Sequence, residues 1–162
     1  MNVTEANRAR HLVIHLDRGD ELPASLLRAL NEHEARSGWI SGTGSLESAE
    51  LAIEGLDGRE TRRRLDTPSS VVALTGNVAI EGGAIGLRLS VTLSRETELG
   101  LTLAGGTLVG GRARSLDLHL TIFDDVQLVR GGDERGQSVL SGKKHGSVLT
   151  GELGRTPVVE AK

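Results

Sequence analysis

Histidines are the side chains of this sequence best suited to metal binding and proton transfer, and they are scattered along it. The five histidines are His11, His15, His33, His119 and His145. None belongs to a His-Glu-x-x-His pattern, which would place two imidazoles on one face of a helix. His11 and His15 share a face of a predicted strand but are too far apart to chelate one ion easily. We therefore expect surface or interface histidines and no metal site.

Asp117 and His119 are the pair with the best spacing for acid–base chemistry. They project from the same face of a predicted strand and could form an Asp–His pair. A serine beside them would complete a nucleophilic triad. The sequence lacks the Gly-x-Ser-x-Gly turn that presents such a serine. We therefore predict no catalytic residues, no enzyme activity and no cofactor.

Two glycine-rich segments resemble phosphate-binding loops only superficially. Gly42 and Gly44 lack a third glycine and do not open a helix, as a dinucleotide-binding turn would. Residues 136–144 have one residue too many between the glycines of a Walker A motif, and Lys144 replaces its magnesium-binding Ser or Thr. Neither segment predicts a nucleotide site.

Two basic clusters are candidates for contact with nucleic acid. One lies beside or on a predicted hairpin, and the other lies near the C-terminus. Their members are Arg59, Arg62, Arg63, Arg64, Lys143 and Lys144. Repetition around a symmetry axis would multiply a weak phosphate contact. The alternative is that the charges are solvated and protect a sheet edge from aggregation.

The composition limits the classes of protein that remain. The chain has 162 residues, a net charge of −3 and no cysteine, so it suits one domain without disulfides or zinc–thiolate sites. It has 22 glycines, one Trp, one Phe and no Tyr, so the core must be aliphatic. Its apolar runs are short, as in Leu12–Ile14, against the ~20 residues that span a bilayer. We expect a soluble cytoplasmic protein that does not enter a membrane.

One helix is expected early in the chain, after a first strand at His11–Leu16. It is predicted over about 22–37, with Asp20 as a possible N-cap, Pro23 in its first turn and Gly38 ending it in a left-handed conformation. Its apolar stripe consists of Leu22, Leu26, Leu27 and Leu30.

After Gly38 the apolar residues recur with the period of a strand. Asp57-Gly58 is a hairpin signal between two of these segments. The strand candidates are Trp39-Ile40, Leu51–Ile53, Thr61–Leu65 as a polar edge, Val71–Ile80, Leu87–Ser94, Leu99–Leu103, Leu116–Phe123 and Val126–Val129. One early helix and six or more strand segments predict an α+β domain with a mostly antiparallel sheet of about six or seven strands.

The pattern also predicts three regions along the chain. Residues 1–10 are expected to be an N-terminal extension, and residues 11–130 to be the folded domain. Periodicity disappears after residue 130, so residues 131–162 are expected to be a flexible C-terminal tail.

Several motifs together resemble the plant-and-prokaryote conserved (PPC) domain, in its stand-alone prokaryotic form. The motifs, in order, are Gly42-Thr43-Gly44-Ser45-Leu46, Leu74-Thr75-Gly76-Asn77-Val78, Leu87–Ser94 and Ala104-Gly105-Gly106-Thr107-Leu108. The resemblance covers about residues 10–130. It implies a curved antiparallel sheet with a helix packed on it, and assembly as a homotrimer. One helix cannot cover both faces of such a sheet, which independently favours an oligomer.

The chain departs from this family at the positions of a histidine metal site. Many prokaryotic relatives have a His-x-His pair where Arg88 and Ser90 stand, and another His at Thr107. An arginine is a fixed cation that repels a metal ion, so the family's metal site should be absent. Two readings of Arg88, Ser90 and Thr107 remain open, an anion-binding pocket or a polar row at an interface. The Arg-Gly-Arg-Pro AT-hook of plant relatives is also missing.

The leading functional hypothesis is a non-enzymatic homotrimeric PPC-type module with a regulatory role and DNA as a candidate partner. A first alternative is a small-molecule or anion-binding protein, or a weak enzyme, that uses the pocket near Arg88. A second alternative is a trimeric scaffold whose tail recruits a protein partner.

Overall fold

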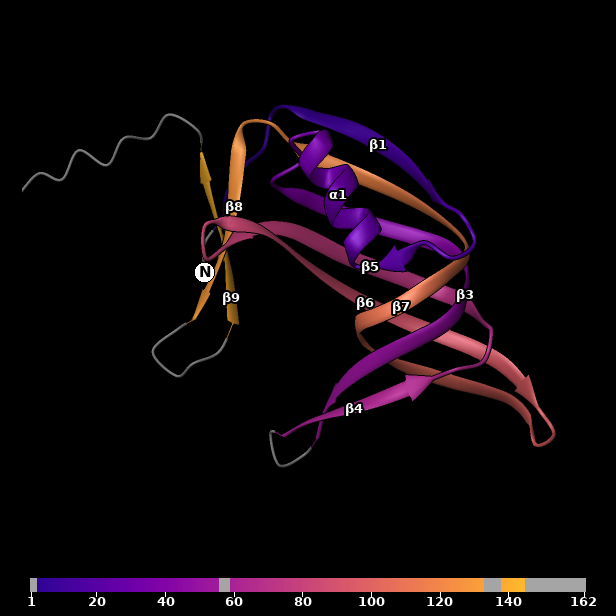
Figure 1. The fold of residues 1–162 in the computed structure, drawn as a ribbon. Coiled ribbons are helices and arrows are strands. Elements are labelled where there is room, and N and C mark those ends of the chain that lie inside the picture. The colour runs from indigo at the N-terminus through magenta and orange to yellow at the C-terminus, as the bar shows by residue number, and fades with distance from the viewer. Residues whose placement is uncertain (1–2, 56–58, 133–137, 145–162) are drawn as a thin grey trace, which may run out of the picture.

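The computed structural model describes residues 3–55, 59–132 and 138–144, which form one helix and nine strands (Figure 1). The elements are β1 Ala9–Leu16, β2 Glu21–Leu22, α1 Ala24–Glu32, β3 Gly38–Glu54, β4 Glu60–Leu65, β5 Ser69–Glu81, β6 Ala84–Thr97, β7 Gly100–Phe123, β8 Val126–Gly132 and β9 Ser138–Lys144. Among these residues every strand pairing is antiparallel except a short contact between β5 and β8. The α+β class with a mostly antiparallel sheet and one helix is confirmed, but the described residues form nine strands where about six or seven were predicted.

The helix is shorter than predicted at both ends. Pro23, not Asp20, is the N-cap residue, so the helix begins at Ala24. The side chain of Asp20 instead accepts hydrogen bonds from the Asp17 N–H and from the hydroxyl of Ser25. At nine residues, α1 is too short to cross a bilayer, and the described residues contain no helix that is long and apolar enough to do so.

The end of the helix was predicted at the wrong residue. Glu34 takes the left-handed conformation, with a φ of 50°, and the Ala35 N–H donates to the Leu30 carbonyl at 2.8 Å. Gly38 already belongs to β3, where its backbone lies against the carbonyl oxygen of Thr121. The glycine is therefore needed for close strand packing and not for a helix cap.

β3 and β7 are each a single long strand where the sequence pattern predicts two shorter strands. β7 runs through both Gly-Gly pairs, which resemble turns in the sequence. At Gly106 an added Cβ would lie 2.8 Å from the Ala52 oxygen, and at Gly111 it would lie 2.7 Å from the Ser48 oxygen. These glycines let β3 and β7 approach each other closely, so they continue the strand instead of ending it.

Four strands of the sheet pair in a closed circuit. β3 pairs with β7, β7 with β6, β6 with β5, and β5 again with β3. β1 and β2 add to β7, and the exposed strand β4 is at one end of the strand order, as predicted for a polar edge. The helix packs on one face of this curved sheet, where Leu26 and Leu30 are fully buried with the main aliphatic core.

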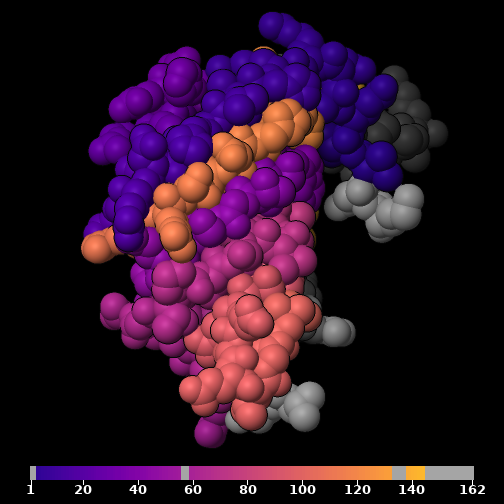
Figure 2. Space-filling view, turned by 90° about the vertical axis from the view of Figure 1, so that its right-hand side faces the viewer, coloured from indigo at the N-terminus to yellow at the C-terminus, as the bar shows by residue number. Residues whose placement is uncertain are grey.

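The opposite face of the sheet has no helix over it in the described residues. Figure 2 shows β1, β7, β3, β5 and β6 side by side on it, as successive indigo, orange, purple, magenta and salmon bands. We call this surface the open face. Its cross-strand rows contain His11, Thr121, Trp39, Asn77 and Arg88, then Val13, His119, Ser41, Thr75, Ser90 and Thr107, then His15, Asp117 and Thr43.

The C-terminal region differs from the predicted tail that starts at residue 131. β8 continues to Gly132, and Ser138–Lys144 form β9, which pairs along the whole of β8. A small separate core supports this hairpin, formed by Ala79, Val126 and Leu128. The rest of the predicted tail, 145–162, and the predicted Asp57-Gly58 turn lie outside the described residues.

Part of the predicted N-terminal extension is anchored to this region. The hydroxyl of Thr4 donates to the Gly142 carbonyl oxygen at 3.1 Å. The carboxylate of Asp125 accepts the backbone N–H groups of Asn7 at 2.8 Å and Arg8 at 3.2 Å. These hydrogen bonds, that of Asn7 foremost, lower the pKa of the Asp125 carboxyl.

Candidate binding sites on the open face

The three residues at the family's histidine positions lie together on the open face. Ser90 and Thr107 are direct cross-strand partners of β6 and β7. Arg88 precedes Ser90 by two residues, so its side chain leaves the same side of the strand. The strand register therefore brings Thr107 next to Ser90, a proximity that the sequence alone does not show.

Two adjoining hollows contain these residues. Arg88 and Thr107 line a hollow of about 560 Å³, and Ser90 and Thr107 line a neighbouring one of about 420 Å³. Ala52, Glu54 and Thr107 belong to both. The hollows therefore form one continuous depression over β3, β6 and β7.

The charges in this depression are mixed. Arg88 is exposed and has no ion-pair partner among the described residues. Arg130 also lines the depression, but its guanidinium is buried and donates to Glu81 at 3.0 Å and to Asn77. Glu54, Glu60 and Glu81 also line the depression, but Glu60 pairs with Arg62 and Glu81 with Arg130. Arg88 is therefore the cation of this depression that is available to an anion. The described residues contain no group of three or more His, Cys, Asp or Glu side chains that could hold a metal.

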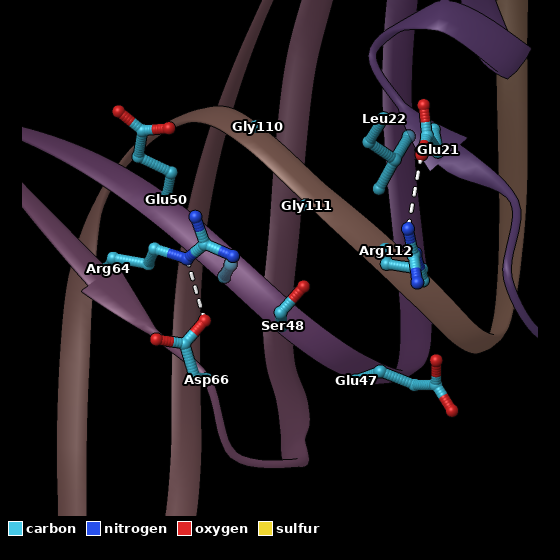
Figure 3. A pocket seen from close by; sticks show the side chains of 11 residues that line it. Glu21, Leu22, Glu47, Ser48, Glu50, Arg64, Asp66, Gly110, Gly111 and Arg112 are labelled. Atoms are coloured by element: carbon cyan, nitrogen blue, oxygen red, sulfur yellow. Dashed lines mark hydrogen bonds and ion pairs between the residues drawn. The ribbon is translucent and has the colours of Figure 1, made fainter.

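A further hollow of about 470 Å³ lies between β2, β3, β4 and β7, and sequence reasoning missed it (Figure 3). Its two arginines already have acidic partners. Arg64 Nε lies 2.6 Å from Asp66, and Arg112 Nη2 lies 3.2 Å from Glu21. The hollow's other two carboxylates, Glu47 and Glu50, pair with Arg18 and Arg62 outside it. Every one of these charges has a partner of opposite sign among the described residues, so none of them requires a ligand.

The arginine cluster lies on and beside the edge strand β4. Arg62 Nε lies 3.1 Å from Glu60 and its Nη1 lies 3.5 Å from Glu50. The hydrogen bond that Arg62 donates to Glu60, and then the negative charge of Glu60, raise the pKa of the Arg62 guanidinium. Asp66 raises the pKa of the Arg64 guanidinium in the same way. Acidic neighbours thus offset much of the positive charge that the sequence concentrates here.

The other members of the basic clusters have different surroundings. Arg63 points to the other side of β4 and has no ion pair among the described residues, whereas Arg59 has an interaction partner. Lys143 and Lys144 lie on β9, at the opposite end of the strand order from β4, and Lys144 is also engaged. The two basic clusters therefore do not form a single patch.

The histidines of the open face pair differently from the prediction. Asp117 accepts a hydrogen bond from His15 Nδ1 at 2.7 Å, so its partner is His15 and not His119. This bond, more than the charge of Asp117, raises the pKa of His15. His119 Nε2 instead lies 3.1 Å from His11 Nδ1. The predicted Asp117–His119 pair is wrong because the β1–β7 register places His15 directly opposite Asp117.

Comparison with known proteins identifies the family of this chain and solved structures with a similar fold. The sequence profile of the Plants and Prokaryotes Conserved (PCC) domain matches residues 3–124. A PPC protein from Pyrococcus horikoshii has 19% identity and a TM-score of 0.76, over 90% of this chain and 100% of that one. A metal-containing protein from Archaeoglobus fulgidus has 21% identity and a TM-score of 0.75, over 84% and 95%.

A third similar structure is from Ralstonia eutropha and is named "Putative DNA-binding protein". It has 19% identity and a TM-score of 0.69, over 80% of this chain and 89% of that one. No curated protein sequence matches this chain. At these identities the similarity to solved structures concerns the fold.

Proposed function

The chain belongs to the Plants and Prokaryotes Conserved domain family, also written PPC, and from that premise we propose that it is a non-enzymatic homotrimeric module with a regulatory role. The three-fold assembly is what the family resemblance implies. The observation that carries self-association in this chain is a row of exposed leucines on β7.

These leucines lie on the hairpin of β6 and β7. Leu99 is 100% exposed, Leu101 73% and Leu103 62%. Leu101 and Leu103 alternate along β7, so they project from one side of the strand, and Leu99 lies in the turn just before it. Val72 of β5 adds another exposed apolar side chain. Several large aliphatic side chains grouped on one element are typical of a surface that a protein partner covers.

A second copy of the chain is the partner that fits best. Within the described part of the chain, one nine-residue helix covers one face of the sheet, and no layer covers the open face or the hairpin. Identical copies supply complementary apolar surface in a closed symmetric arrangement. Antiparallel sheets tolerate a solvated face, but such faces are normally polar, which the leucine row is not.

DNA is the partner that we propose for this assembly, through the arginines of β4. The Ralstonia protein with the same fold is named for DNA binding. The ion pairs of Arg62 and Arg64 are well exposed, and such pairs contribute about 0–1 kcal/mol. A phosphate can therefore displace their carboxylates at little cost. Arg63 adds a charge without an ion pair among the described residues.

Threefold symmetry would repeat this short basic strand around one axis. Each copy makes only a weak contact with phosphate, but linked contacts bind together more strongly than any one of them. Contacts of this kind are made mainly with the phosphates of the DNA backbone, so the affinity depends strongly on salt and little on base sequence.

The test is binding to a fluorescent DNA duplex between about 50 mM and about 200 mM salt. We expect affinity that falls with salt and that the triple variant Arg62→Glu, Arg63→Glu, Arg64→Glu abolishes. A matched control with the same change in net charge is Arg28→Glu, Arg36→Glu, Arg114→Glu, since these exposed arginines lie away from β4. No binding at low salt, or equal loss in both variants, would contradict DNA as the partner.

A second candidate function is binding of a small anion in the depression beside Arg88. The observation in its favour is that Arg88, which lines the same hollow as Thr107, has no ion-pair partner among the described residues. A guanidinium with neighbouring hydroxyl groups suits a phosphate or carboxylate.

A thermal-shift experiment with inorganic phosphate and simple carboxylates tests this second function. A ligand at 100 times its Kd stabilises the folded state by about 2.7 kcal/mol. The shift should disappear in Arg88→Gln and persist in Arg114→Gln, an exposed arginine outside the depression. The absence of a saturable shift, or equal shifts in both variants, would eliminate this function.

A further inference from the structure

Two imidazoles of the open face form a close pair that the proposed function does not use. His11 belongs to β1 and His119 to the adjacent strand β7. His11 lies directly opposite Thr121, and His119 lies directly opposite Val13, so the two histidines are diagonal neighbours across the strand pair. His11 Nδ1 lies 3.1 Å from His119 Nε2, and the two rings are stacked with centroids 5.1 Å apart and planes inclined by 12°. Both side chains are exposed, so the pair is open to solvent.

The separation of the two nitrogens suits a shared metal ion. With metal–nitrogen distances of about 2.0–2.1 Å, nitrogens at this separation subtend about 98° at the ion. This angle lies between the cis angle of square-planar or octahedral complexes and the tetrahedral angle. In the metal-free pair, one ring donates an N–H hydrogen bond to the other, so one of the two facing nitrogens carries a proton. A metal ion would take the place of this hydrogen bond, and the donor ring would shift its single proton to its outer nitrogen, so that both rings bind the ion as neutral imidazoles.

The surroundings of the pair also favour a cation. The hydroxyl oxygen of Thr121 lies 3.3 Å from His11 Nδ1 and is a neutral oxygen donor at the same spot. Asp117, two residues before His119 on β7, contributes a negative charge to the same face. Its carboxylate accepts a hydrogen bond from His15 of β1. Water completes the coordination, because the described residues bring no third His, Cys, Asp or Glu to the pair.

We propose that His11 and His119 form a two-imidazole site for a divalent transition-metal ion of the zinc, copper or nickel type. These ions prefer imidazole nitrogen, whereas magnesium and calcium prefer oxygen donors. The site lies on β1 and β7, while Arg88, Ser90 and Thr107 lie on β6 and the first half of β7. It is therefore separate from the depression at the family's histidine positions and independent of the DNA proposal.

Titration calorimetry with Zn²⁺ alone tests the proposal on the full chain. We expect one ion per chain, with affinity about tenfold or more weaker in His11→Gln and in His119→Gln. His15→Gln and His33→Gln are matched controls, because His15 shares the open face and His33 follows the helix, and neither belongs to the pair. Both controls should bind as the unaltered protein does.

Electron paramagnetic resonance with Cu²⁺ gives a second readout that needs no variant to fold. The spectrum of the unaltered protein should contain hyperfine coupling to two imidazole nitrogens. The proposal is overturned if Zn²⁺ does not bind, if both pair variants bind Zn²⁺ unchanged, or if loss of affinity is equal in the His15→Gln control.

Discussion

Arg130 Nη1 lies 3.0 Å from Glu81 Oε2, at the place where β8 meets β5. The two residues are also cross-strand partners in the parallel contact between these strands, and the side chain of Arg130 is only 4% exposed. Its other terminal nitrogen donates to the side chain of Asn77, farther back on β5. One buried guanidinium thus attaches the β8–β9 hairpin to the main sheet.

Replacement of this arginine should destabilise the protein. Arg130→Met removes the donors of two hydrogen bonds and should lower the free energy of unfolding by about 1–3 kcal/mol. Urea denaturation followed by circular dichroism measures the change. Arg95→Met is the control, because its hydrogen bond to Thr67 is exposed and should matter little. Equal midpoints for the unaltered protein and Arg130→Met would show that the attachment does not contribute to stability.

Gly44 of β3 is a position where only glycine fits. Its φ is +137°, and an added Cβ would meet the Ser115 carbonyl oxygen and come within 2.9 Å of Leu116 Cα. Gly44→Ala should therefore lower the free energy of unfolding by about 2 kcal/mol or more, through backbone strain and a steric clash. Gly131→Ala is a matched control, because nothing lies within 4 Å of its added Cβ. Thermal denaturation that ranks the two variants equally would contradict this assignment.

The pair of His15 and Asp117 should make stability depend on pH. The folded protein has a raised His15 pKa, chiefly because the ring donates a hydrogen bond to Asp117. Its contribution is therefore fully present below the unfolded pKa of 6.5 and is lost as the pH rises through the higher folded pKa. His15→Gln should reduce the melting temperature more at about pH 5.5 than at about pH 8.5.

A titration by NMR checks the cause of that dependence. The His15 ring in the unaltered protein should titrate at a higher pH than in Asp117→Asn, in which the carboxylate is missing. His33, which is exposed beyond the end of α1, provides the reference. A His15 titration that does not respond to Asp117→Asn would mean that the hydrogen bond does not persist in solution.

The sequence predicts the class of fold because its periodicity is local information. In β6, Leu89, Val91 and Leu93 are buried, whereas Arg88 and Ser90 between and beside them are exposed, as the alternation requires. The helix was also found, since its leucines recur at helical spacing. Its ends were misplaced because they depend on backbone conformations at Pro23 and Glu34 that composition does not specify.

What the sequence could not predict depends on register between distant segments. His11 and His119 are 108 positions apart, so their contact follows only from the alignment of β1 with β7. The hollow in Figure 3 has the same origin, because four separate strands contribute to it. Gly106 and Gly111 stand between two predicted strand segments that the structure joins in β7, where these glycines allow β3 to approach closely.

The candidate site at Arg88, Ser90 and Thr107 was located by resemblance and not by residue chemistry. An arginine, a serine and a threonine at these positions carry no motif of their own. Their proximity rests on the pairing of Ser90 with Thr107, which a family pattern contains and a single sequence does not.

The leucine row on β7 should control self-association. Leu101→Glu with Leu103→Glu places charges on the surface that we propose is buried between copies, and should convert the proposed assembly to single chains. Val139→Glu is the matched control, because Val139 is 46% exposed and lies on β9. Equal effects of the double variant and the control would exclude the hairpin as the contact surface.

Sedimentation velocity of the unaltered protein at micromolar concentration tests the central claim, that this chain works as a self-associated module. The account predicts a single species of three chain masses, which the Leu101→Glu, Leu103→Glu variant reduces to one chain mass while Val139→Glu retains it. A single chain mass for the unaltered protein, unchanged with increasing concentration, would contradict the account.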